Sequence, residues 1–200
     1  MTQIIVPDNK NLLFDGPYLD TPATENISAW TGARKVIGGP GAEIWHGRVT
    51  IDTIATEQEE RQWRAFLFAL FGRMNWFKVL LPCAMHSGNR PTVAAGATNA
   101  YTLGLSGMAP STTILTAGQW MTVPLPSGRY RAVCLLNNLT SDGGGNAIAN
   151  FAPALSETPT IGATVETKDP FIPFASAENR LGLSLADGVS GTSFDVREYR

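Results

Sequence analysis

Glycine and proline are spread so densely along this chain that they limit the length of any regular element. The 200 residues include 20 Gly and 13 Pro, and both residue types interrupt helices and strands. One segment alone has the pattern for a helix of several turns, whereas short runs of alternating apolar and polar residues recur between turn signals. The sequence therefore predicts a mainly β protein with one α-helix.

The helix is predicted at 57–71. The run Thr56-Glu57-Gln58-Glu59 is a capping box, in which the Thr56 hydroxyl and the Glu59 carboxylate each accept a backbone N–H at the helix start. Apolar residues then recur at helical spacing on one face: Trp63, Phe66, Leu67, Leu70 and Phe71. Gly72 suits the helix end. Phe68 lies off this face, so it is buried against another part of the chain or contacts another subunit.

Alternating patterns predict strands on both sides of this helix. The first is 45–51, with Trp45, Gly47, Val49 and Ile51 on one face. The next is 75–81, which contains Trp76 and is followed by Pro82. The others are 112–115, 120–125, 129–136, 147–152, 180–185 and 193–199. Regular short spacing of such strands is typical of a small barrel or sandwich.

A shift in composition after Pro82 predicts two domains. Residues 1–82 with 176–200 are expected to form a β-sandwich that carries the helix. Residues 83–175 are expected to form an inserted outer module, a small β-barrel or β-sandwich. The turn-rich segment 1–24 is expected to be an extended arm that could wrap a neighbouring subunit.

The charge pattern argues against nucleic acid and membrane partners. Charged residues make up 16% of the chain, the formal net charge is −2, and the basic residues are scattered singly, so no stripe is available to track phosphates. No apolar run approaches the length that spans a bilayer, and the first residues do not resemble a secretion signal. We therefore expect synthesis in the cytosol, with Cys83 and Cys134 as free thiols.

No familiar catalytic motif occurs in the sequence. The patterns of a nucleophile elbow, a P-loop and a zinc protease helix are all absent, and neither His46 nor His86 has a metal-ligand spacing. We predict no catalytic residue, no cofactor and no metal. Two alternatives stay open: a carbohydrate-binding β-sandwich that uses Trp30, Trp45 and Trp120, and a hydrolase with dispersed acids among Glu157, Glu166, Asp169 and Glu178.

Several segments together resemble the distal tail proteins of long-tailed bacteriophages. These are the capped helix 56–72 leading to the strand 76–82, the segment 114–123, and the pair Arg180-Leu181. Gln119 stands where that pattern usually has an acidic residue. The resemblance implies a non-enzymatic structural protein of the virion tail, made in the cytoplasm of the host bacterium.

The resemblance also implies the partners of such a protein. Six copies would form a ring at the distal end of the tail tube, in contact with the tail tube protein and with the hub or tip proteins. The candidates for core and interface contacts around the helix are Trp63, Phe66, Leu67, Phe68, Leu70, Phe71 and Trp76.

Overall fold

The fold is known from a computed structural model that describes residues 1–7, 12–54, 56–82, 86, 88–96, 100–183 and 190–200. These residues form two compact units. Unit 1 consists of Met1–Tyr18, Trp45–Leu80 and Phe171–Arg200, and unit 2 consists of Leu19–Ile44 and Leu81–Pro170. The described residues are mainly β with one helix, which confirms the predicted fold class. Their strands form open sheets and no closed barrel.

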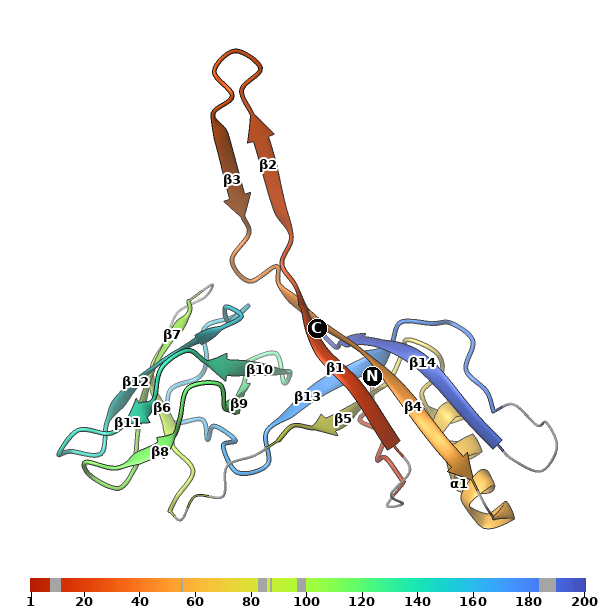
Figure 1. Cartoon of the computed structure of the whole chain (residues 1–200). Coiled ribbons are helices and arrows are strands. Elements are labelled where there is room, and N and C mark those ends of the chain that lie inside the picture. The colour runs from red at the N-terminus through yellow and green to blue at the C-terminus, as the bar shows by residue number, and fades with distance from the viewer. Residues whose placement is uncertain (8–11, 55, 83–85, 87, 97–99, 184–189) are drawn as a thin grey trace. The chain divides into compact units, whose positions relative to one another are not determined.

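Unit 1 is built on a five-stranded sheet with the order β1-β4-β14-β13-β5 (Figure 1). Its strands are β1 (Leu12–Asp20), β4 (Ile44–Ile54), β14 (Ser190–Glu198), β13 (Phe171–Ser176) and β5 (Trp76–Leu80). The antiparallel partner of β5 is β13, with Phe174 opposite Phe77. Strand β4 pairs with β14 at the other end of the chain, with Val49 opposite Phe194. The C-terminal strand therefore completes the sheet that the first third of the chain begins.

The predicted alternation of β4 is confirmed. Trp45, Gly47, Val49 and Ile51 are buried, while Arg48 between them is exposed. Gly47 has a specific packing role, because the ring of Phe14 lies directly over it. A Cβ atom at position 47 would come within 2.4 Å of Phe14 Cε2, so a larger residue would force the Phe14 ring or β1 to shift.

Helix α1 (Glu57–Ala69) begins as the sequence predicts and ends two residues earlier. The Glu59 N–H donates to Thr56 Oγ1 at 3.2 Å and the Thr56 N–H donates to Glu59 Oε2 at 3.3 Å, which confirms the capping box. Leu70 is the C-cap, and Phe71 adopts a left-handed backbone with φ of 46°. The chain therefore leaves the helix before Phe71, whose side chain is 70% exposed rather than on the buried face.

The buried face of α1 packs on the sheet through aromatic rings. Trp63 meets Phe66 edge to face with centroids 5.5 Å apart, and Phe66 meets Phe77 of β5 in the same way at 5.4 Å. Phe77 in turn contacts Phe194 of β14 at 6.3 Å. Such edge-to-face pairs add about 0.5–1.5 kcal/mol each beyond area burial, so this chain of rings forms the centre of the unit 1 core.

Unit 2 contains three sheets. The largest has five strands in the order β6-β7-β12-β10-β9. Their bounds are β6 (Thr92–Ala95), β7 (Thr102–Ser106), β12 (Ala147–Ala152), β10 (Tyr130–Leu135) and β9 (Trp120–Pro124). Strands β8 (Thr113–Leu115) and β11 (Leu139–Thr140) form a second sheet, and β2 (Ala23–Ile27) and β3 (Arg34–Gly38) form the third, a hairpin.

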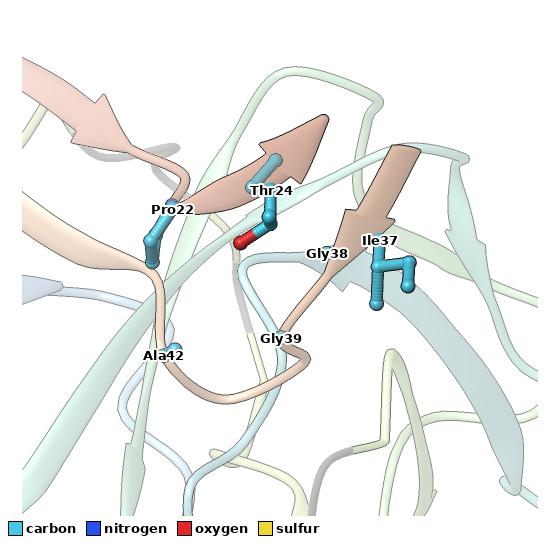
Figure 2. A pocket seen from close by; sticks show the side chains of 7 residues that line it. Pro22, Thr24, Ile37, Gly38, Gly39 and Ala42 are labelled. Atoms are coloured by element: carbon cyan, nitrogen blue, oxygen red, sulfur yellow. The ribbon is translucent and has the colours of Figure 1, made fainter. Parts of the chain in front are cut away.

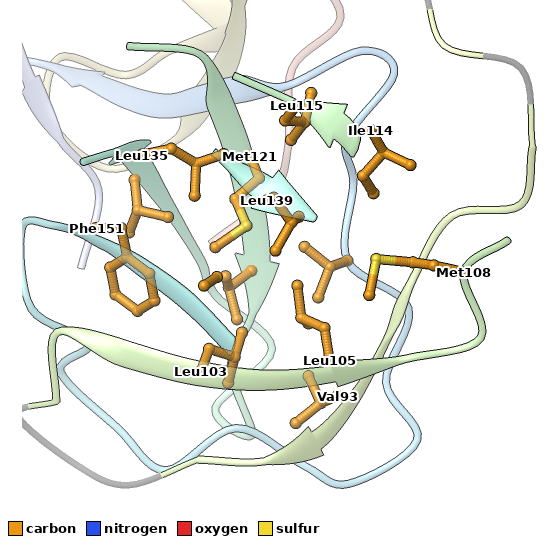
Figure 3. Close-up of a cluster of buried hydrophobic side chains, with 14 of the residues drawn as sticks. Val93, Leu103, Leu105, Met108, Ile114, Leu115, Met121, Leu135, Leu139 and Phe151 are labelled. Atoms are coloured by element: carbon orange, nitrogen blue, oxygen red, sulfur yellow. The ribbon is translucent and has the colours of Figure 1, made fainter. Parts of the chain in front are cut away.

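The first two of these sheets enclose one apolar core (Figure 3). Leu103 and Leu105 of β7, Met121 of β9 and Phe151 of β12 are all buried there. The predicted strands at 112–115, 120–125, 129–136 and 147–152 are all present with small shifts at their ends. Burial alternates along β12, whereas β9 and β10 each have three consecutive buried residues, 121–123 and 131–133.

Three details of the sequence interpretation differ from the structure. Residues 171–175 were predicted to lie in the outer module, yet they form β13 in the middle of the unit 1 sheet. Residues 19–44, predicted with the first domain, cluster with unit 2. The predicted strand 180–185 has no regular structure over 180–183, and its last two positions lie outside the described residues.

The predicted N-terminal arm also differs. The Trp76 N–H donates to the Thr2 carbonyl at 3.3 Å, and the Ile4 N–H donates to the Trp76 carbonyl at 2.7 Å. Residues 12–20 form β1 beside β4. Much of the segment 1–24 is therefore held by the unit 1 sheet, and the exposed extension is the hairpin that follows it.

Candidate interaction surface

The β2–β3 hairpin is exposed on both of its faces. Every residue from 21 to 40 is exposed except Ser28, which is half-buried. The side chains include Ile27, Val36 and Ile37, and Trp30 at the tip is 98% exposed. Strands β2 and β3 pair only with each other among the described strands (Figure 1), so each leaves one edge of backbone groups unpaired. Such edges are templates for pairing with another chain.

Local interactions define the shape of the hairpin tip. The Ser28 N–H donates to the Ala33 carbonyl and the Gly32 N–H donates to the Ser28 carbonyl, both at 2.9 Å. Gly32 takes a left-handed backbone with φ of 66°, which costs glycine little. Below the tip, the Arg34 guanidinium pairs with Glu25 across the strands at 2.5 Å. The turn therefore presents Trp30 on a well-defined loop.

The base of the hairpin is anchored in unit 2 by a buried carboxylate. Glu43 accepts hydrogen bonds from the Gly41 N–H and the Tyr101 hydroxyl, both at 2.7 Å. The buried guanidinium of Arg131 donates to the Glu43 carbonyl at 2.8 Å and to the Ala154 carbonyl at 3.1 Å. The hydrogen bond to Glu43, with smaller effects of burial and charge, raises the pKa of Tyr101 above its usual range. This network fixes the segment between the end of the hairpin and the start of β4.

A shallow hollow of about 410 Å³ lies at this base (Figure 2). Its walls come from both strands and from the turn after β3: Pro22, Ala23, Thr24, Ile37, Gly38, Gly39 and Ala42. Thr24 and Ile37 are cross-strand partners, so their side chains share one face of the hairpin. The Ala42 N–H donates to the Gly39 carbonyl at 2.9 Å, which closes the turn. The surface is mostly apolar, with the Thr24 hydroxyl as a polar group.

A second exposed apolar surface lies on unit 1 at the end of α1. It consists of Phe68, Phe71 and Met74, and we call it the 68–74 patch. Phe68 is 60% exposed, which favours the subunit-contact interpretation over burial within the chain. The patch has a defined backbone, since the Phe71 N–H donates to the Phe68 carbonyl at 3.1 Å. Three large apolar side chains are thus exposed within seven residues, and exposed apolar clusters often mark surfaces that bind other proteins.

The structure separates the predicted candidates into two groups. Trp63, Phe66, Leu67, Leu70 and Trp76 are buried and belong to the unit 1 core, whereas Phe68 and Phe71 are exposed. The sequence interpretation missed the hairpin and its hollow. The signal that marked them was the cluster of Ile27, Trp30 and Ile37 in a segment with no regular alternation.

The hydrolase alternative depends on four acidic residues: Glu157, Glu166, Asp169 and Glu178. Burial raises the pKa of Glu166, but Arg90, whose Nε lies at 2.6 Å, and two backbone amides outweigh it, so this pKa is lowered overall. Glu157 accepts from Ser127 Oγ at 2.7 Å, and Glu178 accepts from the Asp195 N–H at 3.3 Å. These carboxylates thus hold loops and strands together.

The histidines and cysteines are placed as follows. His86 shares a 2.8 Å hydrogen bond with Thr167, and His46 lies on β4. Cys134 is a free thiol whose pKa burial raises, and Cys83 lies outside the described residues. Within the described ranges, no three His, Cys, Asp or Glu side chains come together as metal ligands would. In the same ranges, no helix has the length and apolar character needed to cross a membrane.

The tryptophans of the carbohydrate-binding alternative are in different environments. Trp45 is 5% exposed inside unit 1, so it cannot stack on a sugar. Trp120 is half-buried on β9, and Trp30 is exposed at the tip of the hairpin. No protein-family model matches this sequence, and no curated protein is significantly similar to it.

Proposed function

We propose that this chain is a structural subunit of a bacteriophage tail. In this proposal, copies of the chain form a ring, most simply a hexamer, at the distal end of the tail tube, and the ring links the tube to the tip or baseplate. Its partners are further copies of itself, the tail tube protein and the hub or tip proteins. The protein performs no reaction.

The observation that carries the assembly part of the proposal is the exposed β2–β3 hairpin. An isolated two-stranded hairpin is marginally stable in water, and this one exposes Ile27, Val36, Ile37 and Trp30 to solvent. Such an element gains stability when a partner covers its apolar side chains and unpaired edges. The 68–74 patch gives unit 1 an apolar surface of its own. A subunit with two such surfaces suits an assembly in which each copy has more than one neighbour.

The tail part of the proposal rests on the sequence resemblance. The pattern of a capped helix, then an apolar strand ending in proline, corresponds here to α1, β5 and Pro82. The low proportion of charged residues agrees with a protein whose surface is largely covered by neighbours.

The mass of the purified protein in solution tests the proposal. A hexamer of 21.4 kDa subunits has a mass of about 128 kDa, which light scattering after gel filtration resolves from a monomer. Negative-stain images should then show rings with a central channel. A strictly monomeric protein at about 100 µM would contradict the proposal. A dissociation constant above about 100 µM corresponds to a binding free energy weaker than about −5.5 kcal/mol.

Excision of the hairpin tests its role directly. Ala23 and Gly38 are paired neighbours, so a short Gly/Ser linker can replace residues 21–40 without separating the flanking strands. We expect a folded monomer whose circular dichroism and melting temperature stay close to those of the full chain. An assembled deletion variant would show that the hairpin is not the contact that holds the ring.

Glycan binding distinguishes the alternative function. If a monomeric protein bound an oligosaccharide and lost that binding on Trp30→Ala, the carbohydrate-binding interpretation would replace the assembly proposal. Because Trp45 is buried, such a site would depend on Trp30 or Trp120.

A further inference from the structure

The hairpin carries a large apolar side chain at its tip and an apolar hollow at its base. Trp30 at the tip is 98% exposed, more than any other large apolar residue in the described part of the chain. The hollow of about 410 Å³ is lined by Thr24, Ile37 and Ala42 together with small neighbours (Figure 2). Both features lie on one element, so every copy of the chain presents both.

The two features cannot meet within one copy. Thr24 lines the hollow, and Glu25, Asn26 and Ile27 of β2 follow it before the tip turn begins at Ser28. A strand rises about 3.3 Å per residue, so Trp30 lies beyond a point roughly 13 Å from Thr24 of its own hairpin. The paired strands keep it there, because folding the tip back would break the cross-strand hydrogen bonds of both strands.

We propose that the hollow receives Trp30 from a second copy of this chain. This inference deepens the proposed ring function and rests on it, since it names the residues that join neighbouring copies. A tip inserted into a base is a head-to-tail contact, in which each copy donates one Trp30 and accepts another. Head-to-tail contacts of this type close into rings when the rotation between copies permits.

The chemistry of the hollow suits an indole. Tryptophan buries 150–250 Å² of mostly apolar surface and has one N–H that needs an acceptor. Pro22, Ile37 and Ala42 offer the apolar walls, and Figure 2 shows the Thr24 hydroxyl among the lining atoms, where it can accept the indole N–H. Gly38 and Gly39 lack side chains that would fill the space.

The size of this contact sets what its loss should do. The area buried by one tryptophan, together with the area that it covers on its partner, is well under the roughly 1,000 Å² that a specific interface buries. The unpaired strand edges and the 68–74 patch are therefore expected to supply further contact. Trp30 would act as a hot spot, and truncation of a hot-spot residue weakens association about 30-fold or more.

Two complementary variants of the full-length chain test the inference. Trp30→Ala removes the tip side chain and leaves the hollow open, whereas Ala42→Phe leaves the tip intact and fills the hollow. Both positions are exposed, so folding should be unchanged. We expect each variant alone to need at least about 30-fold more protein for assembly than the unmodified chain. The control is Ile161→Ala, which removes a side chain that is 74% exposed and lies outside the hairpin and the hollow.

A mixture of the two variants gives the sharper result. The intact Trp30 of the Ala42→Phe copy can enter the open hollow of the Trp30→Ala copy, but neither end of that pair can continue the chain. Light scattering should therefore show 1:1 dimers in the mixture at concentrations where each variant alone is monomeric.

In the unmodified protein, acrylamide quenching of the one highly exposed tryptophan should fall as the protein assembles.

The outcomes separate the inference from the ring proposal. If the unmodified chain forms rings and both variants form them equally well, the tryptophan contact is refuted while the ring stands. If the unmodified chain stays monomeric at about 100 µM, both are refuted. If an oligosaccharide protects Trp30 from quenching in a monomer, the residue belongs to a sugar site and the inference is overturned.

Discussion

Replacing Trp63 with alanine should strongly destabilise unit 1. Trp63 is completely buried and meets Phe66 edge to face at 5.5 Å. Truncation of a buried Phe or Trp to Ala costs about 3–5 kcal/mol, because transfer free energy is lost and a cavity remains. For a chain of this length, each kcal/mol lowers the melting temperature by about 2–4 °C, so the expected drop is at least about 6 °C.

A second substitution at the same position separates burial from hydrogen bonding. No acceptor within the described residues lies within hydrogen-bonding distance of the Trp63 indole N–H, and an unpaired buried donor costs about 1–3 kcal/mol. Trp63→Phe removes that donor and keeps an aromatic ring against Phe66. We therefore expect it to cost less than half as much as Trp63→Ala.

Thermal unfolding followed by near-ultraviolet circular dichroism measures both variants, with Trp30→Ala as an exposed control measured below its assembly concentration. The reasoning would be refuted if Trp63→Ala melted within about 2 °C of the unmodified chain. It would also be refuted if Trp63→Phe were the more destabilising change, because the unpaired donor would then have a partner that the packing does not reveal.

Three smaller predictions concern single turns. Gly145→Ala should destabilise unit 2 and lower its melting temperature, because φ is 75° there and a Cβ atom would come within 2.3 Å of the Met108 carbonyl oxygen. Phe71→Gly should stabilise unit 1 by about 1 kcal/mol in denaturant titrations, since it relieves a left-handed backbone at an exposed residue. The N–H groups of Asn146 and Gly144 hold the pKa of Asp142 below its usual range. This stabilisation is complete above about pH 3.9 and is lost as the pH falls through the lowered native pKa, which NMR titration of the carboxyl will show.

The elements that the sequence predicts well are those with strong local signals. Helix α1 has a capping box, a regular apolar face and a glycine near its end, so its start agrees with the prediction. Strand β4 alternates because one face meets the core and the other does not. In both cases the pattern reflects burial on one side, which sequence periodicity records directly.

Strand β13 was missed because it is buried on both faces. All six residues from Phe171 to Ser176 are buried, so there is no alternation to detect. Pro173 in its centre also argued for a loop, since proline cannot donate to a ladder. The Pro173 carbonyl is nevertheless used, because the Tyr199 N–H donates to it at 2.8 Å. Long-range pairing of this type has no local signature, and the predicted domain boundary was displaced as a result.

The hairpin was missed for the opposite reason, and this reason bears on its function. Both faces of β2 and β3 are exposed, so their sequence carries neither the alternation of a half-buried strand nor the continuous apolar run of a buried one. Apolar residues outside any core pattern do not help to bury the core of their own chain. The hairpin nevertheless exposes four of them: Ile27, Val36, Ile37 and Trp30. Exposed apolar side chains lower solubility and contribute little to the stability of an isolated hairpin. A partner that covers them supplies the missing burial, and for a chain that presents both the tip and the hollow, another copy of itself meets that need.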